Sequence, residues 1–118
     1  MRELTENLPK LIDESGVLVL QFGDAACAPC HAIRYKLDLW LKENENVIAR
    51  YIDNPSHLEL CAQMGIFSAP TVIVYMDGQV AARESGYFSL EAILERVEHY
   101  SKQEMEMLDT IQRKLRYQ

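Results

Sequence analysis

The chain has 118 residues and 48% hydrophobic content, which suits a single domain with one core. Its formal net charge of -6 argues against a nucleic-acid surface, because phosphate binding needs clustered Lys and Arg. The longest apolar runs, residues 17–20 and 72–76, fall far short of the roughly 18 residues that a membrane-spanning helix requires. We therefore expect neither nucleic acid nor a membrane as a partner.

The cysteine count and the first residues bear on the cellular compartment. Three cysteines are too few for a disulfide framework, which favours a reducing compartment. Residues 1–10 contain Glu3 and Glu6, and they lack the charged-then-apolar order of a secretion signal. We expect a cytoplasmic protein.

The first half of the chain alternates helix and strand patterns. Asn7 is suited to cap a short helix that Gly16 would end. Residues 17–22 are apolar and β-branched, as is typical of a strand buried on both faces. From Cys27 the apolar residues recur three and four apart, which predicts a helix that begins directly after this strand and stops at residues 42–46.

The pattern of the second half predicts a strand in residues 47–52 and a helix in residues 57–64 that Gly65 would end. Two further strands are predicted in residues 71–76 and 79–85. Asp77-Gly78 separates the last two runs and is a strong hairpin signal, so these strands should be antiparallel neighbours. The whole order predicts an α/β fold.

The last helical pattern starts after Ser89, a suitable cap, and continues without Gly or Pro. Its apolar spacing is interrupted just after Tyr100, so we expect one helix to end there and a second amphipathic piece to follow. The predicted organisation is a domain of residues 1–100 and a helical extension of residues 101–118. The apolar stripe of this extension could fold back onto its own domain, bind a client protein or pair with a second copy of the chain. We favour a homodimer.

Residues 27–31 (CAPCH) fit two motifs. As C-x-x-C-H they match the attachment site of a c-type haem, and as C-x-x-C in an α/β chain they match a dithiol redox centre. Zinc would need four ligands, and only His31 and the distant Cys61 could add to the cysteine pair. Covalent haem is attached outside the cytosol, so we favour the dithiol, which needs no cofactor or metal. Cys61 shares an apolar stripe with Leu58, and we expect it to be a buried small hydrophobe.

The position of the pair predicts unequal thiols. Cys27 opens the helix, where the free backbone N–H groups and the partial positive charge lower the pKa of a thiol. Cys30 should lie on the more buried side, and it would resolve the mixed disulfide that Cys27 forms with a client. Pro29 restricts the backbone and Ala28 leaves the approach to Cys27 open. His31 shares the helical face of Cys27, where it either steadies the thiolate or is simply solvated.

Residues 22–30 (FGDAACAPC) and 65–87 (GIFSAPTVIVYMDGQVAARESGY) together resemble the thioredoxin family, and the resemblance extends from about Asn7 to Tyr100. It implies a thioredoxin fold, with a central mixed β-sheet of four or five strands flanked by helices, and here an extended C-terminal helix. It also implies that the protein reduces or exchanges disulfides in client proteins. The electron donor would be thioredoxin-reductase-like or a low-molecular-weight thiol.

The resemblance assigns roles to single residues. Cys27 would be the nucleophile and Cys30 the resolving thiol. Pro70 would be the cis-proline, and the backbone of Ala69 would face Cys27 and pair with an extended client segment. Gly86 would let the client backbone approach on the other side.

Three departures from the family pattern are informative. Gln21 stands where a buried aspartate usually lies beneath the second cysteine, and a carboxamide cannot relay a proton. Ala49 or Arg50 falls where a partner lysine is common. Gly23 and Ala26 replace tryptophans, which leaves a smaller apolar rim. We expect resolution of the mixed disulfide to be slow, and the alternative function is a binding module in which the dithiol is incidental.

Overall fold

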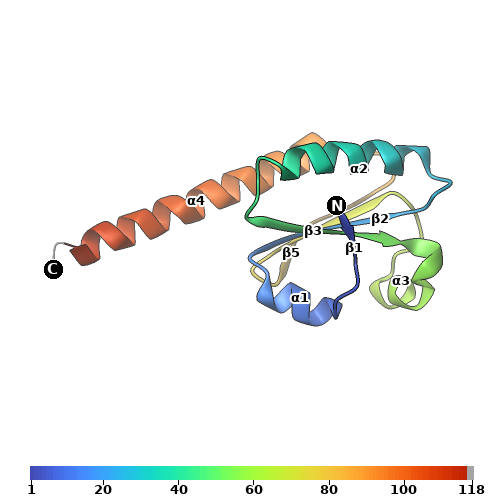
Figure 1. The fold of residues 1–118 in the computed structure, drawn as a ribbon, viewed down its shortest axis with the longest axis horizontal. Helices are drawn as coiled ribbons and strands as arrows, with labels where there is room; N and C mark the ends of the chain where they lie inside the picture. Colours follow the sequence, from blue (N-terminus) through green and yellow to red (C-terminus); the bar gives the residue numbers. More distant parts are fainter. Residues whose placement is uncertain (117–118) are drawn as a thin grey trace. The chain divides into compact units, whose positions relative to one another are not determined.

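A computed structural model describes residues 1–116. The elements are, in chain order, β1 (Arg2–Glu3), α1 (Leu8–Glu14), β2 (Val17–Gly23), α2 (Ala28–Leu41), β3 (Val47–Asp53), the 3₁₀ turn η1 (Asn54–Ser56), α3 (Leu58–Met64), β4 (Thr71–Met76), β5 (Gln79–Ser85) and α4 (Leu90–Arg116). The strands form one five-stranded sheet of order β1-β3-β2-β4-β5 (Figure 1). The predicted α/β fold is confirmed, with five strands.

Strand β2 lies at the centre of the sheet. It runs parallel to β3 and antiparallel to β4, while β1 extends the sheet beyond β3 and β5 pairs with β4 as a hairpin. Every residue of β2 is buried, as its continuous apolar pattern predicts. Asp77 and Gly78 both have positive φ angles, 50° and 81°, which is the geometry of a two-residue hairpin turn.

The two faces of the sheet are covered by different helices. In Figure 1, α1 and α3 lie on one side of the sheet and α2 lies on the other. The main apolar cluster belongs to the side of α1 and α3, and it contains Leu4, Leu8, Leu18, Leu20, Phe22, Ile52, Cys61, Ile66, Ile73 and Tyr75. Because side chains alternate along a strand, Val19 and Gln21 point to the opposite face, toward α2. This core holds the strand whose end leads directly to the cysteine pair.

Local caps agree with the sequence prediction. The Asn7 side chain accepts a hydrogen bond from the Lys10 amide at 3.0 Å at the start of α1. Gly65 ends α3 with a φ of 69°, and the Ser89 hydroxyl accepts a hydrogen bond from the Ala92 amide at 3.1 Å before α4.

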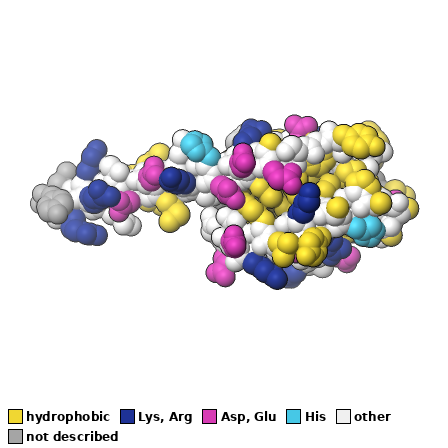
Figure 2. Space-filling model, turned by 90° about the horizontal axis from the view of Figure 1, so that it is seen from above, with side chains coloured by type: hydrophobic (Ala, Val, Ile, Leu, Met, Phe, Trp, Pro, Cys, Tyr) yellow, Lys and Arg dark blue, Asp and Glu magenta, His cyan; other side chains and the backbone are white. Residues whose placement is uncertain are grey.

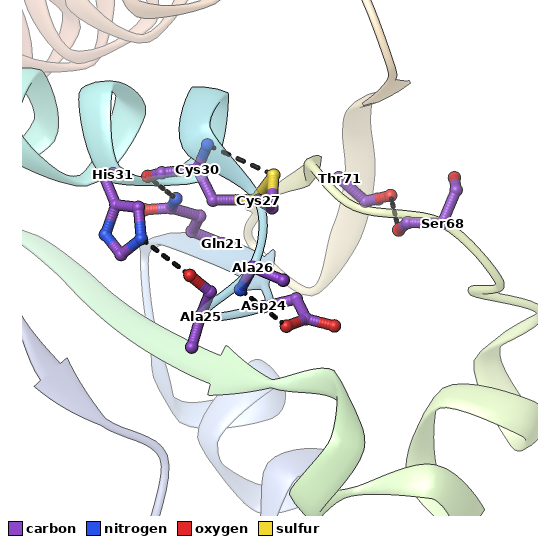
Figure 3. Close-up of a disulfide and its surroundings, with 9 residues drawn as sticks. All are labelled: Gln21, Asp24, Ala25, Ala26, Cys27, Cys30, His31, Ser68 and Thr71. Carbon is purple, nitrogen blue, oxygen red and sulfur yellow. Dashed lines mark hydrogen bonds between the residues drawn. A yellow bond between two sulfur atoms is a disulfide. The ribbon is translucent and has the colours of Figure 1, made fainter.

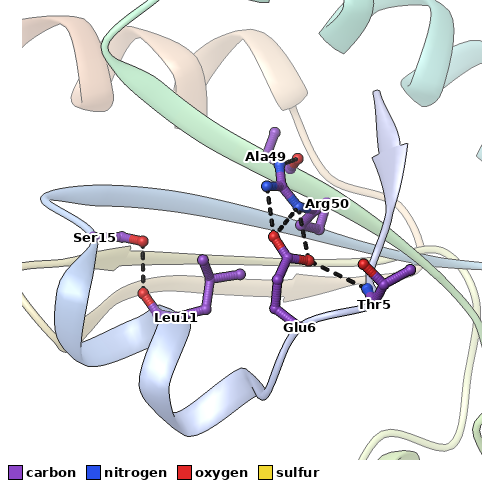
Figure 4. A network of polar contacts seen from close by, with 6 residues as sticks. All are labelled: Thr5, Glu6, Leu11, Ser15, Ala49 and Arg50. Atoms are coloured by element: carbon purple, nitrogen blue, oxygen red, sulfur yellow. Dashed lines mark hydrogen bonds and ion pairs between the residues drawn. The ribbon is translucent and has the colours of Figure 1, made fainter.

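A polar clamp joins the segment before α1 to β3 (Figure 4). Arg50 donates to both carboxylate oxygens of Glu6, with its Nε at 3.1 and 2.9 Å and its Nη2 at 2.6 Å. This hydrogen bonding with Arg50 lowers the pKa of Glu6 to about 2. Arg50 pairs with Leu20 in the sheet register, so its side chain lies on the face of the sheet away from Gln21. Ala49 pairs with Val19 and lies on the same face as Gln21.

Helix α4 differs from the prediction. It continues without a break through its 27 residues, so the expected helix end near Tyr100 is wrong. Strong helix formers without Gly or Pro maintain the helix even where its apolar stripe is interrupted. The first 88 residues form one compact unit and α4 belongs to a second. Leu90, Ile93, Leu94 and Val97 are buried, whereas the described residues after Ser101 are all exposed. No helix in residues 1–116 has the length and apolar character needed to cross a membrane.

Candidate active site

The cysteine pair lies at the start of α2 (Figure 3). Cys27 is the N-cap residue and is joined to Cys30 by a disulfide, with their Cα atoms 5.3 Å apart. The Cys30 amide donates to the Cys27 sulfur at 3.3 Å. Cys27 is partly exposed, whereas Cys30 is buried, with a relative exposure of 2%. In the reduced protein a thiolate at Cys27 would therefore be stabilised by a helix N-terminus, while Cys30 stays shielded.

The loop before α2 is held by hydrogen bonds among its own residues and by a contact with His31. The Ala26 amide donates to the Asp24 carboxylate at 2.9 Å, and the Cys27 amide donates to the Asp24 carbonyl at 3.0 Å. The His31 Nε2 lies 3.0 Å from the Ala25 carbonyl oxygen. The imidazole thus contacts this loop rather than the Cys27 sulfur, so in the oxidised state it braces the backbone that carries the nucleophile.

Gln21 lies in β2 beneath Cys30 (Figure 3) and is fully buried. Its Nε2 donates to the Cys30 carbonyl oxygen at 2.8 Å. Its Oε1 is buried and has no hydrogen-bond partner within the described part of the chain. A buried polar atom without a partner lowers the stability of the fold by about 1–3 kcal/mol, so the position of this oxygen is energetically unfavourable. The side chain is an amide and Ala49 adds no charge, so neither of these two positions supplies a proton acceptor to Cys30.

A groove of about 310 Å³ opens beside the disulfide. It is lined by Ala26, Cys27, Ala28, Pro29, Ala69, Pro70, Gly86 and Tyr87. The fold therefore brings the substrate-binding residues predicted from two distant segments to one place. Cys30, Gln21 and His31 are not part of this lining. The Ala69–Pro70 peptide bond is cis, and the Gly86 amide donates to the Pro70 carbonyl oxygen at 3.0 Å.

Sequence reasoning did not single out Tyr87. Its side chain is fully exposed, and it lines the groove next to Gly86. The signal that could have found it is its position directly after the glycine that the family resemblance marks as a client contact. The roles of all these groove residues remain predictions.

Tyr51 is a second residue that sequence reasoning overlooked. A Cβ atom on Gly23 would lie 2.5 Å from the Tyr51 hydroxyl oxygen, so the tyrosine takes the space next to this backbone. The ring is buried, the Arg34 guanidinium carbon lies 4.1 Å from its centroid, and burial raises the pKa of the phenol. Tyr51 of the neighbouring strand thus fills the space that a side chain at position 23 would take.

Cys61 is buried in α3, as predicted, and it is not in a disulfide. Its thiol donates to the Asn54 side-chain oxygen at 3.5 Å, and burial raises its pKa. It lines a separate cavity of about 420 Å³ that also includes Phe67 and Ala69. No cluster of three or more His, Cys, Asp or Glu side chains suited to a metal ion occurs among the described residues.

A five-stranded mixed sheet with a C-x-x-C disulfide at a helix start defines a thioredoxin-fold protein. The thioredoxin family model matches residues 3–99. The chain is 33% identical over 75 residues to a thioredoxin of Echinococcus granulosus, and 30% identical over 70 residues to thioredoxin Asp f 28 of Aspergillus fumigatus. Each match covers 59% of this chain, and they cover 70% and 65% of those relatives, respectively.

The comparison with solved structures also finds a thioredoxin. The X-ray structure of Fasciola hepatica thioredoxin is similar with a TM-score of 0.71 and 29% identity, over 84% of this chain and 99% of that one. This chain therefore belongs to the thioredoxin family, and it carries the C-x-x-C pair of thioredoxin-type oxidoreductases.

Proposed function

We propose that the protein reduces or exchanges disulfides in a restricted set of client proteins through Cys27 and Cys30, in a reducing, cytoplasmic setting. One observation carries this proposal: the Cys27 sulfur accepts a hydrogen bond from the first turn of α2 while it lines an open groove. A thiolate in that position is both stabilised and accessible.

The exchange is a two-electron transfer in two steps. The Cys27 thiolate attacks one sulfur of the client disulfide, whose S–S bond breaks, and the second client sulfur leaves as a thiolate that takes up a proton. Cys30 then loses its proton and attacks the Cys27 sulfur, which releases the first client sulfur. The client is reduced, and the protein ends as the Cys27–Cys30 disulfide seen in the structure.

Repeated turnover requires a donor of two electrons. Family membership supports either a thioredoxin-reductase-like enzyme or a low-molecular-weight thiol such as glutathione in this role. Titration of the Cys27–Cys30 couple against glutathione buffers gives the reduction potential, and a strongly reducing value supports reduction rather than oxidation of clients.

Insulin reduction with dithiothreitol tests the proposed activity. The wild-type protein should accelerate it, and Cys27→Ser should abolish the acceleration. Without dithiothreitol, reduced Cys30→Ser should accumulate a mixed disulfide with the client, because no second thiol releases it. Absence of acceleration by the reduced wild-type protein would refute the proposed activity.

The amide of Gln21 leads us to propose slow resolution by Cys30. Rapid mixing of the reduced protein with a client disulfide, followed by acid quenching at a series of times, measures how fast the mixed disulfide forms and is resolved. Gln21→Asp should speed it up and add a pH dependence, because a buried carboxylate can take the Cys30 proton. Gln21→Asn is the matched amide control and should remain slow. If the wild-type protein resolves as fast as the aspartate variant, this part of the proposal fails.

A second candidate function, partner binding without redox chemistry, is favoured by the exposed apolar side chains late in α4. These are Met105, Met107, Leu108, Ile111 and Leu115. Figure 2 shows hydrophobic side chains among the charged ones along this helix. Replacement of both Cys27 and Cys30 by Ser separates the two functions, since binding of the partner survives only if the dithiol is incidental.

We also propose that this stripe pairs with a second copy of the chain. Three acidic residues precede three basic ones along this part of α4, namely Glu104, Glu106 and Asp109 followed by Arg113, Lys114 and Arg116. An antiparallel pair would bring opposite charges of the two copies together. Sedimentation should show a dimer that Ile111→Glu dissociates and Gln112→Glu preserves. A wild-type monomer at high concentration would contradict the pairing.

A further inference from the structure

Tyr87 is the most exposed of the large hydrophobic side chains in the described structure. Its relative exposure is 104%, compared with 84% for Phe67 and 67% for Tyr35. Water hydrates an aromatic ring poorly, so an aromatic left in solvent beside a groove is typical of a contact made with a partner. Here the groove also contains the Cys27 sulfur.

The backbone at Tyr87 is held in place although its ring is free. Gly86 has a φ of 76°, a left-handed conformation that turns the chain just before the tyrosine. The Gly86 amide is hydrogen-bonded to the Pro70 carbonyl oxygen, and the Thr71 and Ser85 hydroxyls lie 2.8 Å apart. The backbone of Tyr87 is therefore held at a defined place relative to the disulfide, and only the side-chain torsions of the ring have to be ordered when a client binds.

Tyr87 is the largest side chain that lines the groove. The other seven residues of the lining are alanines, prolines, Cys27 and Gly86, and none of them carries a charge or an aromatic ring. An uncharged apolar lining offers no compensation to a charged client side chain that loses water. The groove thus favours an apolar neighbour of the client cysteine.

We infer that Tyr87 determines client specificity: it contacts an apolar or aromatic side chain next to the reactive cysteine of an extended, disulfide-bearing polypeptide. This inference rests on the proposed exchange activity of Cys27 and Cys30 and names its substrate class. A small disulfide that carries no apolar side chain next to its cysteine, such as glutathione disulfide, reacts with Cys27 and gains nothing from the ring. Tyr87 is a specificity residue and takes no part in the exchange of bonds.

The experiment compares Tyr87→Ala, Tyr87→Phe and Tyr35→Ala on three substrates. Tyr35 is also exposed but lies on α2 outside the groove lining, so it is the matched control. The substrates are glutathione disulfide and two disulfide peptides that carry Leu or Asp next to the reactive cysteine. Steady-state kinetics give KM and kcat separately.

We expect Tyr87→Ala to raise KM for the leucine peptide about three- to tenfold, the scale of one lost aromatic contact, while kcat is kept. Its rate with glutathione disulfide should equal that of the wild type. Tyr87→Phe should restore the wild-type KM, because the ring rather than the hydroxyl makes the contact. The wild type should prefer the leucine peptide to the aspartate peptide, and Tyr87→Ala should lose most of that preference.

Two results would overturn the inference. One is an equal effect of Tyr87→Ala on all three substrates, and the other is an effect of Tyr35→Ala as large as that of Tyr87→Ala. Failure of the proposed function looks different, because the wild type would then not react with glutathione disulfide either.

Discussion

The start of α2 and the middle of α3 each hold a cysteine, and only the first is arranged for chemistry. Cys27 caps its helix, receives a backbone N–H on its sulfur and lines a groove. Cys61 also lines a pocket, but it lies within its helix, is buried in the apolar cluster, and its thiol donates a hydrogen bond to the Asn54 side-chain oxygen. The helix end supplies free N–H groups that stabilise an anion, whereas the helix interior has already used them. Position along a helix therefore separates a redox thiol from a packing residue.

The largest expected effect concerns the nucleophile. Cys27→Ser should lower insulin reduction by at least about a hundredfold, because a serine hydroxyl stays protonated near neutral pH and is a poor nucleophile. Cys61→Ala should keep the wild-type rate. A strong loss of activity in Cys61→Ala, measured on folded protein, would mean that α3 takes part in the chemistry.

The reactivity of the two thiols in the reduced protein sharpens the comparison. Burial raises the pKa of Cys61 above that of an ordinary thiol, so little thiolate is present at neutral pH and labelling should rise only in alkaline solution. Cys27 should react with iodoacetamide at pH 7 at least about tenfold faster than Cys61. Mass spectrometry of samples quenched between pH 6 and 10 measures both rates. Equal rates at pH 7 would remove the distinction between the two regions.

The backbone that carries Cys27 has its own packing requirement. Gly23→Ala should lower the free energy of unfolding by about 1–3 kcal/mol, because the new methyl group would overlap the buried Tyr51 ring. Gly16→Ala is the control, since no atom lies within 4 Å of the added carbon. Urea denaturation compares the two variants. Equal stabilities would show that Tyr51 moves aside easily and does not support the redox loop.

The smallest effect lies away from both cysteines. The pKa of Glu6 is lowered to about 2, so its pairing with Arg50 stabilises the fold above its ordinary pKa near 4.5 and this contribution is lost as the pH falls toward 2. Glu6→Gln should be less stable than the wild type at pH 6, and the difference should vanish in strong acid. Glu14→Gln, at an exposed pair with Lys10, should show little difference. An altered Cys27 labelling rate in Glu6→Gln would link the clamp to the redox site.

Much of the fold could be predicted because its signals are local. Asn7, Gly65 and the Asp77-Gly78 turn each end or join an element through the conformation of a few neighbouring residues. The error in α4 has a local cause as well. An interruption in the apolar stripe predicts a helix end, but helix continuity depends on backbone propensity, which stays favourable from Leu90 onward.

Local patterns of residues suffice for the element order and for the placement of Cys27 at a helix start, since these depend on residues within one or two turns. Three relations emerge only in the folded chain: Tyr51 fills the space beside Gly23, Arg50 turns away from Gln21, and Tyr87 borders the groove of Cys27. Those relations depend on strand register and on loops that meet across the sheet, and no short-range pattern in the chain specifies either one.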